Sequence, residues 1–258
     1  MSNGSKVQKV SWDLIDAGEP KAEEIADSLP PRNGLIGKVL APALQLWLRS
    51  LLDGIEDLQV HIPGQVRQIL SGEIPSVAVS ASGAVYQGLH LSEMRLEASK
   101  IRIDIGQILK GKPLRPLQTF PVTVQLYWSE ADLNASLHTP LLQGAISDFL
   151  LSVLASNNAI GDTPSLSRID RIVIGEGRLS FQGIFTSDSH SNTSGVLHGN
   201  LLKASPSQLL FQNPQLQISP ETIKLNDFHL DLGSEIAIEE LTLAPGIAIC
   251  LGRIAVIP

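Results

Sequence analysis

Two carboxylates lie two positions apart in the segment Ser-Glu-Ala-Asp-Leu-Asn, which begins at Ser129. A close pair of carboxylates is what general acid–base catalysis uses, so Glu130 and Asp132 are the first candidates for chemistry. No nucleophile or base lies near them in the sequence, however, and Ser129 with Asp132 also matches the spacing of a helix capping box. We therefore interpret the two acidic residues as the start of a helix.

The histidines and the cysteine do not form a catalytic or metal-binding pattern either. The six histidines lack the short spacing of zinc ligands. Cys250 is the single cysteine and stands between two aliphatic residues, as a small buried hydrophobe would. No G-x-S-x-G, P-loop or H-E-x-x-H motif is present. The sequence therefore predicts a protein that is not an enzyme and uses no metal or cofactor.

One basic cluster stands out, at Lys110, Lys112 and Arg115. Three leucines accompany it, at positions 109, 114 and 117. A solvated loop is one interpretation. The other is a membrane-docking loop, because cations beside exposed leucines suit a surface of phosphate headgroups.

The composition sets the class of protein. Of the 258 residues, 43% are hydrophobic and 17% are charged, which is typical of a globular chain. The net charge of −7 argues against a nucleic-acid partner, which would favour a basic face. We find neither a signal peptide nor an apolar run of about 18 residues, and we expect a soluble, cytoplasmic protein with at most peripheral membrane contact.

Residues 1–33 are predicted to form a flexible arm, and residues 34–258 one domain. The arm is rich in charge and ends near Pro30 and Pro31, which a continuous helix would not cross. Its segment from Trp12 to Ile15 could alternatively dock on the domain, a membrane or a partner.

Two segments have the periodicity of amphipathic helices. In the first, between Gly34 and Leu58, Pro42 predicts a kink or a helix start. Its apolar residues fall on one half of the helix: Ala43, Leu44, Trp47, Leu48, Leu51, Leu52, Ile55 and Leu58. In the second, two apolar rows run side by side, namely Leu137, Leu141, Ala145 and Phe149, and Leu142, Ile146, Leu150 and Val153. This second face either packs as core against a sheet or lines a cavity between helix and sheet.

Most other segments alternate apolar and polar residues, as antiparallel strands with one solvated face do. About five such strands precede the second helix and about seven follow it. The inward parity changes between Ala98 and Ile101, which predicts a bulge or turn near Ser99 and Lys100. The sequence Gly-Glu-Gly at Gly175 predicts a tight hairpin turn. The alternation excludes a doubly wound parallel fold.

At this point the chain resembles the LmeA-like phospholipid-binding family. Three features carry the resemblance, which spans about Val60 to Leu154: Gly-Glu-Ile at Gly72, the strand pair YQGLHLSEMRLEA, and EADLN at Glu130. The absence of an export signal makes the chain more similar to the cyanobacterial type of member than to the exported mycobacterial type.

The resemblance implies an α+β fold of the TULIP type, a BPI-like half-barrel. There a long, curved antiparallel sheet wraps around one or two amphipathic helices and leaves an elongated apolar groove for a glycerophospholipid or similar lipid. Relatives in the superfamily carry lipids between membranes. On the two helix faces we predict as lipid-binding residues Leu44, Trp47, Leu48, Leu51, Leu141, Ala145, Ile146 and Phe149.

Two other functions stay open at this level. A protein–protein interaction module would have the same strands and helices, but a filled core and no ligand. An enzyme that acts on a lipid would need a nucleophile constellation, which the sequence lacks.

Overall fold

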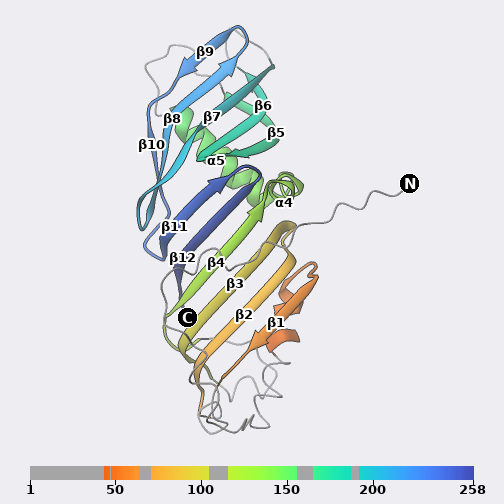
Figure 1. Cartoon of the computed structure of the whole chain (residues 1–258), viewed down its shortest axis with the longest axis vertical. Helices are drawn as coiled ribbons and strands as arrows, with labels where there is room; N and C mark the ends of the chain where they lie inside the picture. The colour runs from red at the N-terminus through yellow and green to blue at the C-terminus, as the bar shows by residue number, and fades with distance from the viewer. Residues whose placement is uncertain (1–43, 47, 64–70, 105–115, 156–164, 187–191) are drawn as a thin grey trace, which may run out of the picture. The chain divides into compact units, whose positions relative to one another are not determined.

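A computed structural model gives the arrangement of the domain (Figure 1). It describes residues 44–46, 48–63, 71–104, 116–155, 165–186 and 192–258. All of these belong to one compact unit, Gly34–Pro258. The predicted arm, residues 1–33, lies outside the described residues.

The first sheet has six antiparallel strands in the order β1-β2-β3-β4-β12-β11. Its strands are β1 (Asp57–His61), β2 (Glu73–Tyr86), β3 (Leu89–Arg102), β4 (Phe120–Ser129), β11 (Ile236–Ala244) and β12 (Ile247–Val256). The last hairpin of the chain therefore pairs with β4, more than a hundred residues earlier in the sequence.

The second sheet has the order β10-β8-β7-β6-β5, and β9 pairs with the end of β8. Its strands are β5 (Ser165–Gly175), β6 (Arg178–Thr186), β7 (Thr193–Ser205), β8 (Gln208–Ile218), β9 (Glu221–Lys224) and β10 (Phe228–Asp231). The antiparallel, strand-dominated architecture that the alternation predicts is confirmed. The predicted single long sheet, however, is divided into two open sheets, because the chain leaves β4 through two helices before it forms β5.

Two local predictions about the strands concern Lys100 and the turn at Gly175. The change of parity near Lys100 is present, but β2 and β3 keep their register there, so the expected bulge is not formed. Lys100 has a φ of +55°, a left-handed conformation at the position where the sequence predicts an irregularity. Ala98 and Ile101 consequently contribute to the same apolar cluster although they are three residues apart. The predicted hairpin turn joins β5 to β6, with Gly175 opposite Arg178.

Two helices follow β4, namely α4 (Glu130–Ala135) and α5 (Pro140–Ala155). Ser129 is the N-cap of α4, and its hydroxyl oxygen accepts a hydrogen bond from the backbone N–H of Asp132, as predicted. The second helix begins with Pro140, whose fixed φ suits the first helical position. The Thr139 hydroxyl accepts from the N–H of Leu142 at 3.3 Å and so caps it.

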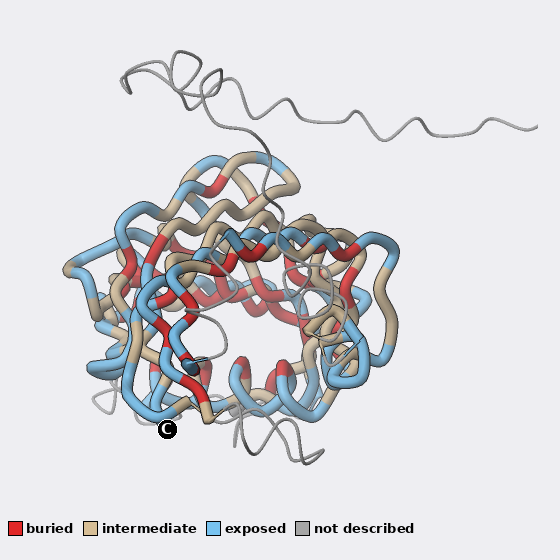
Figure 2. The backbone as a smooth tube through the Cα atoms, turned by 90° about the horizontal axis from the view of Figure 1, so that it is seen from below, coloured by how far each residue is buried: buried red, intermediate tan, exposed pale blue. Residues whose placement is uncertain are grey.

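Three apolar clusters hold the domain together. The largest contains α4, α5 and the inner face of the second sheet, with fully buried Leu150, Leu197 and Phe211. Two smaller clusters lie on the first sheet, where helical residues 44–46 and 48–51 pack through Leu44 and Leu48. Figure 2 shows that buried residues concentrate on strands and helical turns that face one another. Each sheet thus has its own helix against its apolar face.

Candidate functional site

The segment EADLN joins the two sheets. One of its side chains forms the hydrogen bonds to β5 that a neighbouring strand would form. The Asn134 side-chain amide donates to the carbonyl of Ile172, and its oxygen accepts from the N–H of Ile172, both at 2.8 Å. Ile172 belongs to β5, the edge strand of the second sheet. Unpaired edges invite association with other strands, so this amide both covers the edge and fixes α4 on it.

Glu130 also forms hydrogen bonds with the edge strand β5. Its carboxylate accepts from the N–H of Ile174 at 2.9 Å and from the guanidinium of Arg171 at 3.1 Å. The turn between β11 and β12 completes the contact, because Gly246 donates to the carbonyl of Ile174 and accepts from the N–H of Glu130, both at 2.8 Å. Glu130 therefore holds a three-way contact between α4, β5 and the last hairpin.

Asp132 ties α4 to the first sheet. Its carboxylate accepts from the hydroxyls of Ser92 and Ser129, and the Ser92 oxygen accepts from the N–H of Ser129 at 2.8 Å. The fully buried Ser136 accepts from the N–H of His90 at 2.8 Å. Both carboxylates of the segment are thus occupied by structural hydrogen bonds, which supports the capping interpretation of the pair.

The feature that distinguishes the first sheet is an apolar strip in its centre, formed by Leu96, Val124, Leu126 and Cys250. Leu96 pairs with Val124 across β3 and β4, and Leu126 pairs with Cys250 across β4 and β12. All four are half-buried. Because side chains two residues apart on a strand share a face, the strip lies on the face that also carries the packed clusters.

The apolar strip lies between the clusters and belongs to none of them. On one side, Trp128 and Ala248 pack against the large cluster; on the other, Met94 and Ala98 pack against the two smaller ones. Among the described residues, none of the four strip residues is part of a cluster to which a helix contributes. The sheet therefore presents a band of apolar side chains that are not fully withdrawn from water.

The charge state of the strip's one titratable group agrees with an apolar environment. Burial raises the pKa of the Cys250 thiol, so this side chain is neutral and behaves as a small hydrophobe. On the opposite face of β4, burial and the neighbouring Glu93 raise the pKa of Tyr127. The strip therefore offers contacts for an apolar chain and no charge for a polar one.

The predicted residues of the first helix divide into two environments. Leu44 and Leu48 are half-buried and pack against the small clusters, whereas the Leu51 side chain is 48% exposed. Trp47 lies outside the described residues.

The predicted residues of α5 also divide. Ile146 is buried in the large cluster, and Phe149 contacts Phe211 with ring centroids 5.3 Å apart. Leu141 and Ala145 are exposed. The row from Leu137 to Phe149 does not share one environment, because residues four apart drift by about 40° per step around a helix. The side that α5 buries carries the other row, namely Leu142, Ile146, Leu150 and Val153, together with Leu154.

Several other predictions concern residues or features that the structure does not bring into a site. Lys110, Lys112 and Arg115 lie outside the described residues. Among the residues that are described, no three His, Cys, Asp or Glu side chains are grouped so that they could hold a metal ion. No helix in the same part of the chain is long and apolar enough to cross a membrane.

Sequence reasoning did not single out the apolar strip. Its signal was present in the alternation of β3 and β4, where Leu96, Val124 and Leu126 occupy the apolar positions. The sequence did not show that β12 pairs with β4. It also did not show that the helices pack in clusters on the two sides of the strip.

An apolar sheet face that is only partly covered marks a surface for contact with another molecule or an apolar ligand. The model of the family described as LmeA-like phospholipid-binding matches residues 32–250, and the chain belongs to this family. The match extends well beyond the segment Val60–Leu154 on which the resemblance was based. The family is one of lipid-binding domains and not of enzymes. Comparison with curated proteins and with solved structures finds no match.

Proposed function

We propose that the protein binds a glycerophospholipid or a similar long apolar lipid without chemical conversion, in an elongated groove of a TULIP-like fold. The observation that carries this proposal is the apolar strip Leu96, Val124, Leu126 and Cys250, half-buried between packed clusters. An acyl chain laid along the strip would remove both surfaces from water. Each buried methylene contributes about 0.8 kcal/mol, so even a partly covered chain gains several kcal/mol.

The packing favours the first sheet as the place of the acyl chain. Beside the second sheet, Phe149 fills the interior with contacts to Phe181, Phe211 and Phe228. That filled cluster is what a ligand-free interaction module would show, and it is the observation that favours the alternative function. We therefore assign the ligand to the apolar strip. The inner face of the second sheet forms a packed core with α5 and has no place in the proposed ligand site.

Among the predicted helix residues, the exposed ones keep their proposed role as walls of the groove. Leu51, Leu141 and Ala145 are exposed and therefore free to contact a lipid, whereas Ile146 and Phe149 already pack in the core. Leu44, Trp47 and Leu48 complete the proposed set. Transfer of the lipid between membranes, a cytoplasmic location and membrane docking through Lys110, Lys112 and Arg115 are further parts of the proposal.

Native mass spectrometry of the full chain purified from cells tests the proposal. We expect a fraction of the protein to carry a lipid-sized adduct. Leu126→Glu should abolish the adduct, because it places a carboxylate in the strip. Gln125→Glu is the matched control, since its side chain occupies the opposite face of the same strand, and it should retain the adduct. A wild-type protein without any adduct, and without uptake of added phospholipid, would support the interaction module instead.

A further inference from the structure

Several strand ends of the first sheet meet at one end, which we call the sheet tip and define by Lys100, Arg102, Leu117 and Ile257. There β3 ends at Arg102, and Leu117, just before β4, donates its N–H to the carbonyl of Arg102 at 2.8 Å. Ile257 directly follows Val256, which pairs with Phe120 at the start of β4. The end of β3, the start of β4 and the end of β12 therefore lie together at one end of the first sheet (Figure 1), and the four residues lie at or next to these strand ends.

The sheet tip exposes large aliphatic side chains. Leu117 is 61% exposed and Ile257 is 60% exposed, more than any large hydrophobic residue described on the second sheet, where Leu202 reaches 41%. A single exposed aliphatic residue is unremarkable on a protein surface. Two at one end of a sheet, beside cations, are a more specific arrangement.

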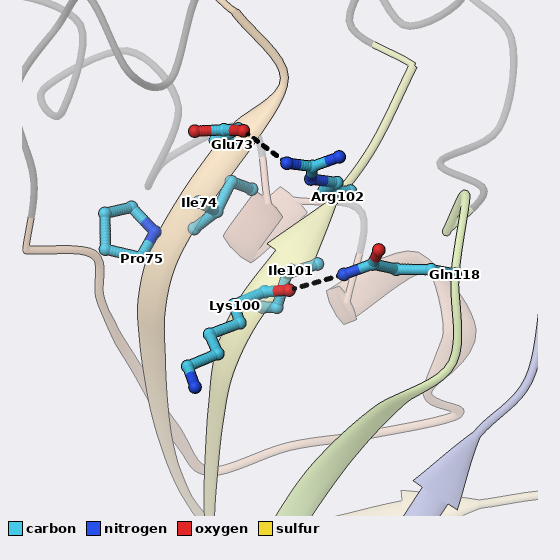
Figure 3. A pocket seen from close by; sticks show the side chains of 7 residues that line it. All are labelled: Glu73, Ile74, Pro75, Lys100, Ile101, Arg102 and Gln118. Atoms are coloured by element: carbon cyan, nitrogen blue, oxygen red, sulfur yellow. Dashed lines mark hydrogen bonds and ion pairs between the residues drawn. The ribbon is translucent and has the colours of Figure 1, made fainter.

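A pocket of about 510 Å³ lies at the same end (Figure 3). Lys100, Arg102 and Gln118 line it, and the Gln118 amide donates to the carbonyl of Lys100 at 3.2 Å. Arg102 forms an ion pair with Glu73 at 2.8 Å, with both side chains more than half exposed. The Lys100 ammonium has no ion-pair partner among the described residues. An exposed ion pair is weak, so Arg102 can exchange Glu73 for another anion at little cost.

The distribution of charge along the chain supports an anionic partner. In a protein with a net charge of −7, residues 100–115 carry five cations and a single carboxylate, Asp104. The chain leaves the sheet tip at Ile103 and returns at Pro116, and these two residues form an antiparallel bridge. The basic part of the sequence is therefore connected at both ends to the sheet tip.

We propose that the sheet tip docks on a bilayer of anionic phospholipid. Leu117 and Ile257 enter the boundary between headgroups and acyl chains, and Lys100 and Arg102 meet the phosphates, since long cationic side chains keep their charge at that level. The partner is a membrane surface, and the inference rests on the proposed function in that a lipid-binding domain must meet the membrane that supplies its ligand.

Vesicle flotation of the full chain tests this. We expect binding to vesicles of phosphatidylcholine with phosphatidylglycerol and much less binding to phosphatidylcholine alone. Lys100→Gln with Arg102→Gln should weaken binding to the anionic vesicles, by roughly fivefold for each cation removed. Leu117→Ser with Ile257→Ser should weaken it by roughly tenfold or more. The controls are Lys224→Gln and Leu202→Ser, an exposed cation and an exposed leucine of the second sheet, which should bind as wild type does.

Uptake of a fluorescent phospholipid from detergent micelles separates this inference from the proposed function. The tip variants should take up the lipid as well as wild type does. Unchanged vesicle binding of all tip variants, or an equal loss in the two controls, would overturn the docking surface while lipid uptake stands. Absence of uptake in wild type would instead overturn the proposed function.

Discussion

Asn134 and Ile172 form the pair of hydrogen bonds that a neighbouring strand would form, although one partner is a side chain on a helix. The two 2.8 Å bonds link α4 to the edge of β5. A third bond, from the Asn134 amide to the carbonyl of Glu130 at 2.7 Å, fixes the side chain in this orientation. One amide therefore supplies two of the hydrogen bonds that hold α4 on β5, beside those of the Glu130 carboxylate.

Asn134→Ala should destabilise the domain by about 2 to 4 kcal/mol, because it leaves both backbone groups of Ile172 and the carbonyl of Glu130 without this partner. Chemical denaturation measures the change. Ser152→Ala is the matched control on the exposed side of α5, where the loss of one helical hydrogen bond should cost less than about 0.5 kcal/mol. Equal stability of the two variants would show that the amide is dispensable.

Ala145→Trp and Ile146→Trp should have opposite effects although the two residues are adjacent. Ile146 is 7% exposed in the packed cluster, so an added ring should destabilise by about 1–3 kcal/mol or more. Ala145 is exposed, so the ring should be tolerated and should reduce lipid uptake if this residue is a wall of the groove. Thermal melting and uptake of a fluorescent lipid, measured on the same samples, decide the outcome. Normal uptake by a fully stable Ala145→Trp variant would remove Ala145 from the proposed site.

His198 should make the domain less stable at mildly acidic pH. Burial, and then the nearby Arg178, lower the pKa of this histidine, so the folded protein prefers the neutral imidazole. Below the ordinary value of about 6.5, the unfolded chain binds a proton that the folded chain binds less well, and stability falls as the pH falls. His198→Gln should flatten this dependence below about pH 7 in chemical denaturation. If the free energy of unfolding of His198→Gln falls with pH as steeply as that of wild type, other groups cause the acid sensitivity.

Gly144→Ala and Gly199→Ala should change the stability of the domain in opposite directions. A Cβ at Gly144, on the exposed side of α5, meets no atom within 4 Å, so Gly144→Ala should stabilise by about 0.5–1 kcal/mol through helix propensity. A Cβ at Gly199 would lie 2.7 Å from the ring of the fully buried Phe211. Gly199→Ala should therefore destabilise by about 1–3 kcal/mol, and denaturation midpoints of the two variants on the same side of wild type would contradict the packing of β7.

Local features of the fold follow from the sequence because their causes are local. The cap at Ser129 and the irregularity at Lys100 each depend on a few neighbouring residues, and both were predictable. The row Leu141, Ala145 and Phe149 was the exception, because residues four apart on one helix drift by about 40° per step, and only Phe149 reaches the buried side of α5.

The long-range features were not accessible in the same way. Alternation tells which side chains share a face of a strand, but it does not say which strands become neighbours. The pairing of Leu126 with Cys250 joins residues that are far apart in the chain, and the apolar strip exists only because of it. The strip's place between the packed clusters likewise depends on where each helix packs.

Photo-crosslinking tests the central claim, that a lipid lies on the apolar strip, most directly. The full chain is incubated with a phospholipid that carries a photoactivatable group near the end of one acyl chain, irradiated, digested and analysed by mass spectrometry. We predict that crosslinks concentrate on peptides that contain Leu96, Val124, Leu126 or Cys250, and that Leu126→Glu removes them whereas Gln125→Glu does not. Crosslinks that are absent, or that spread over the outer faces of both sheets and persist in Leu126→Glu, would contradict it.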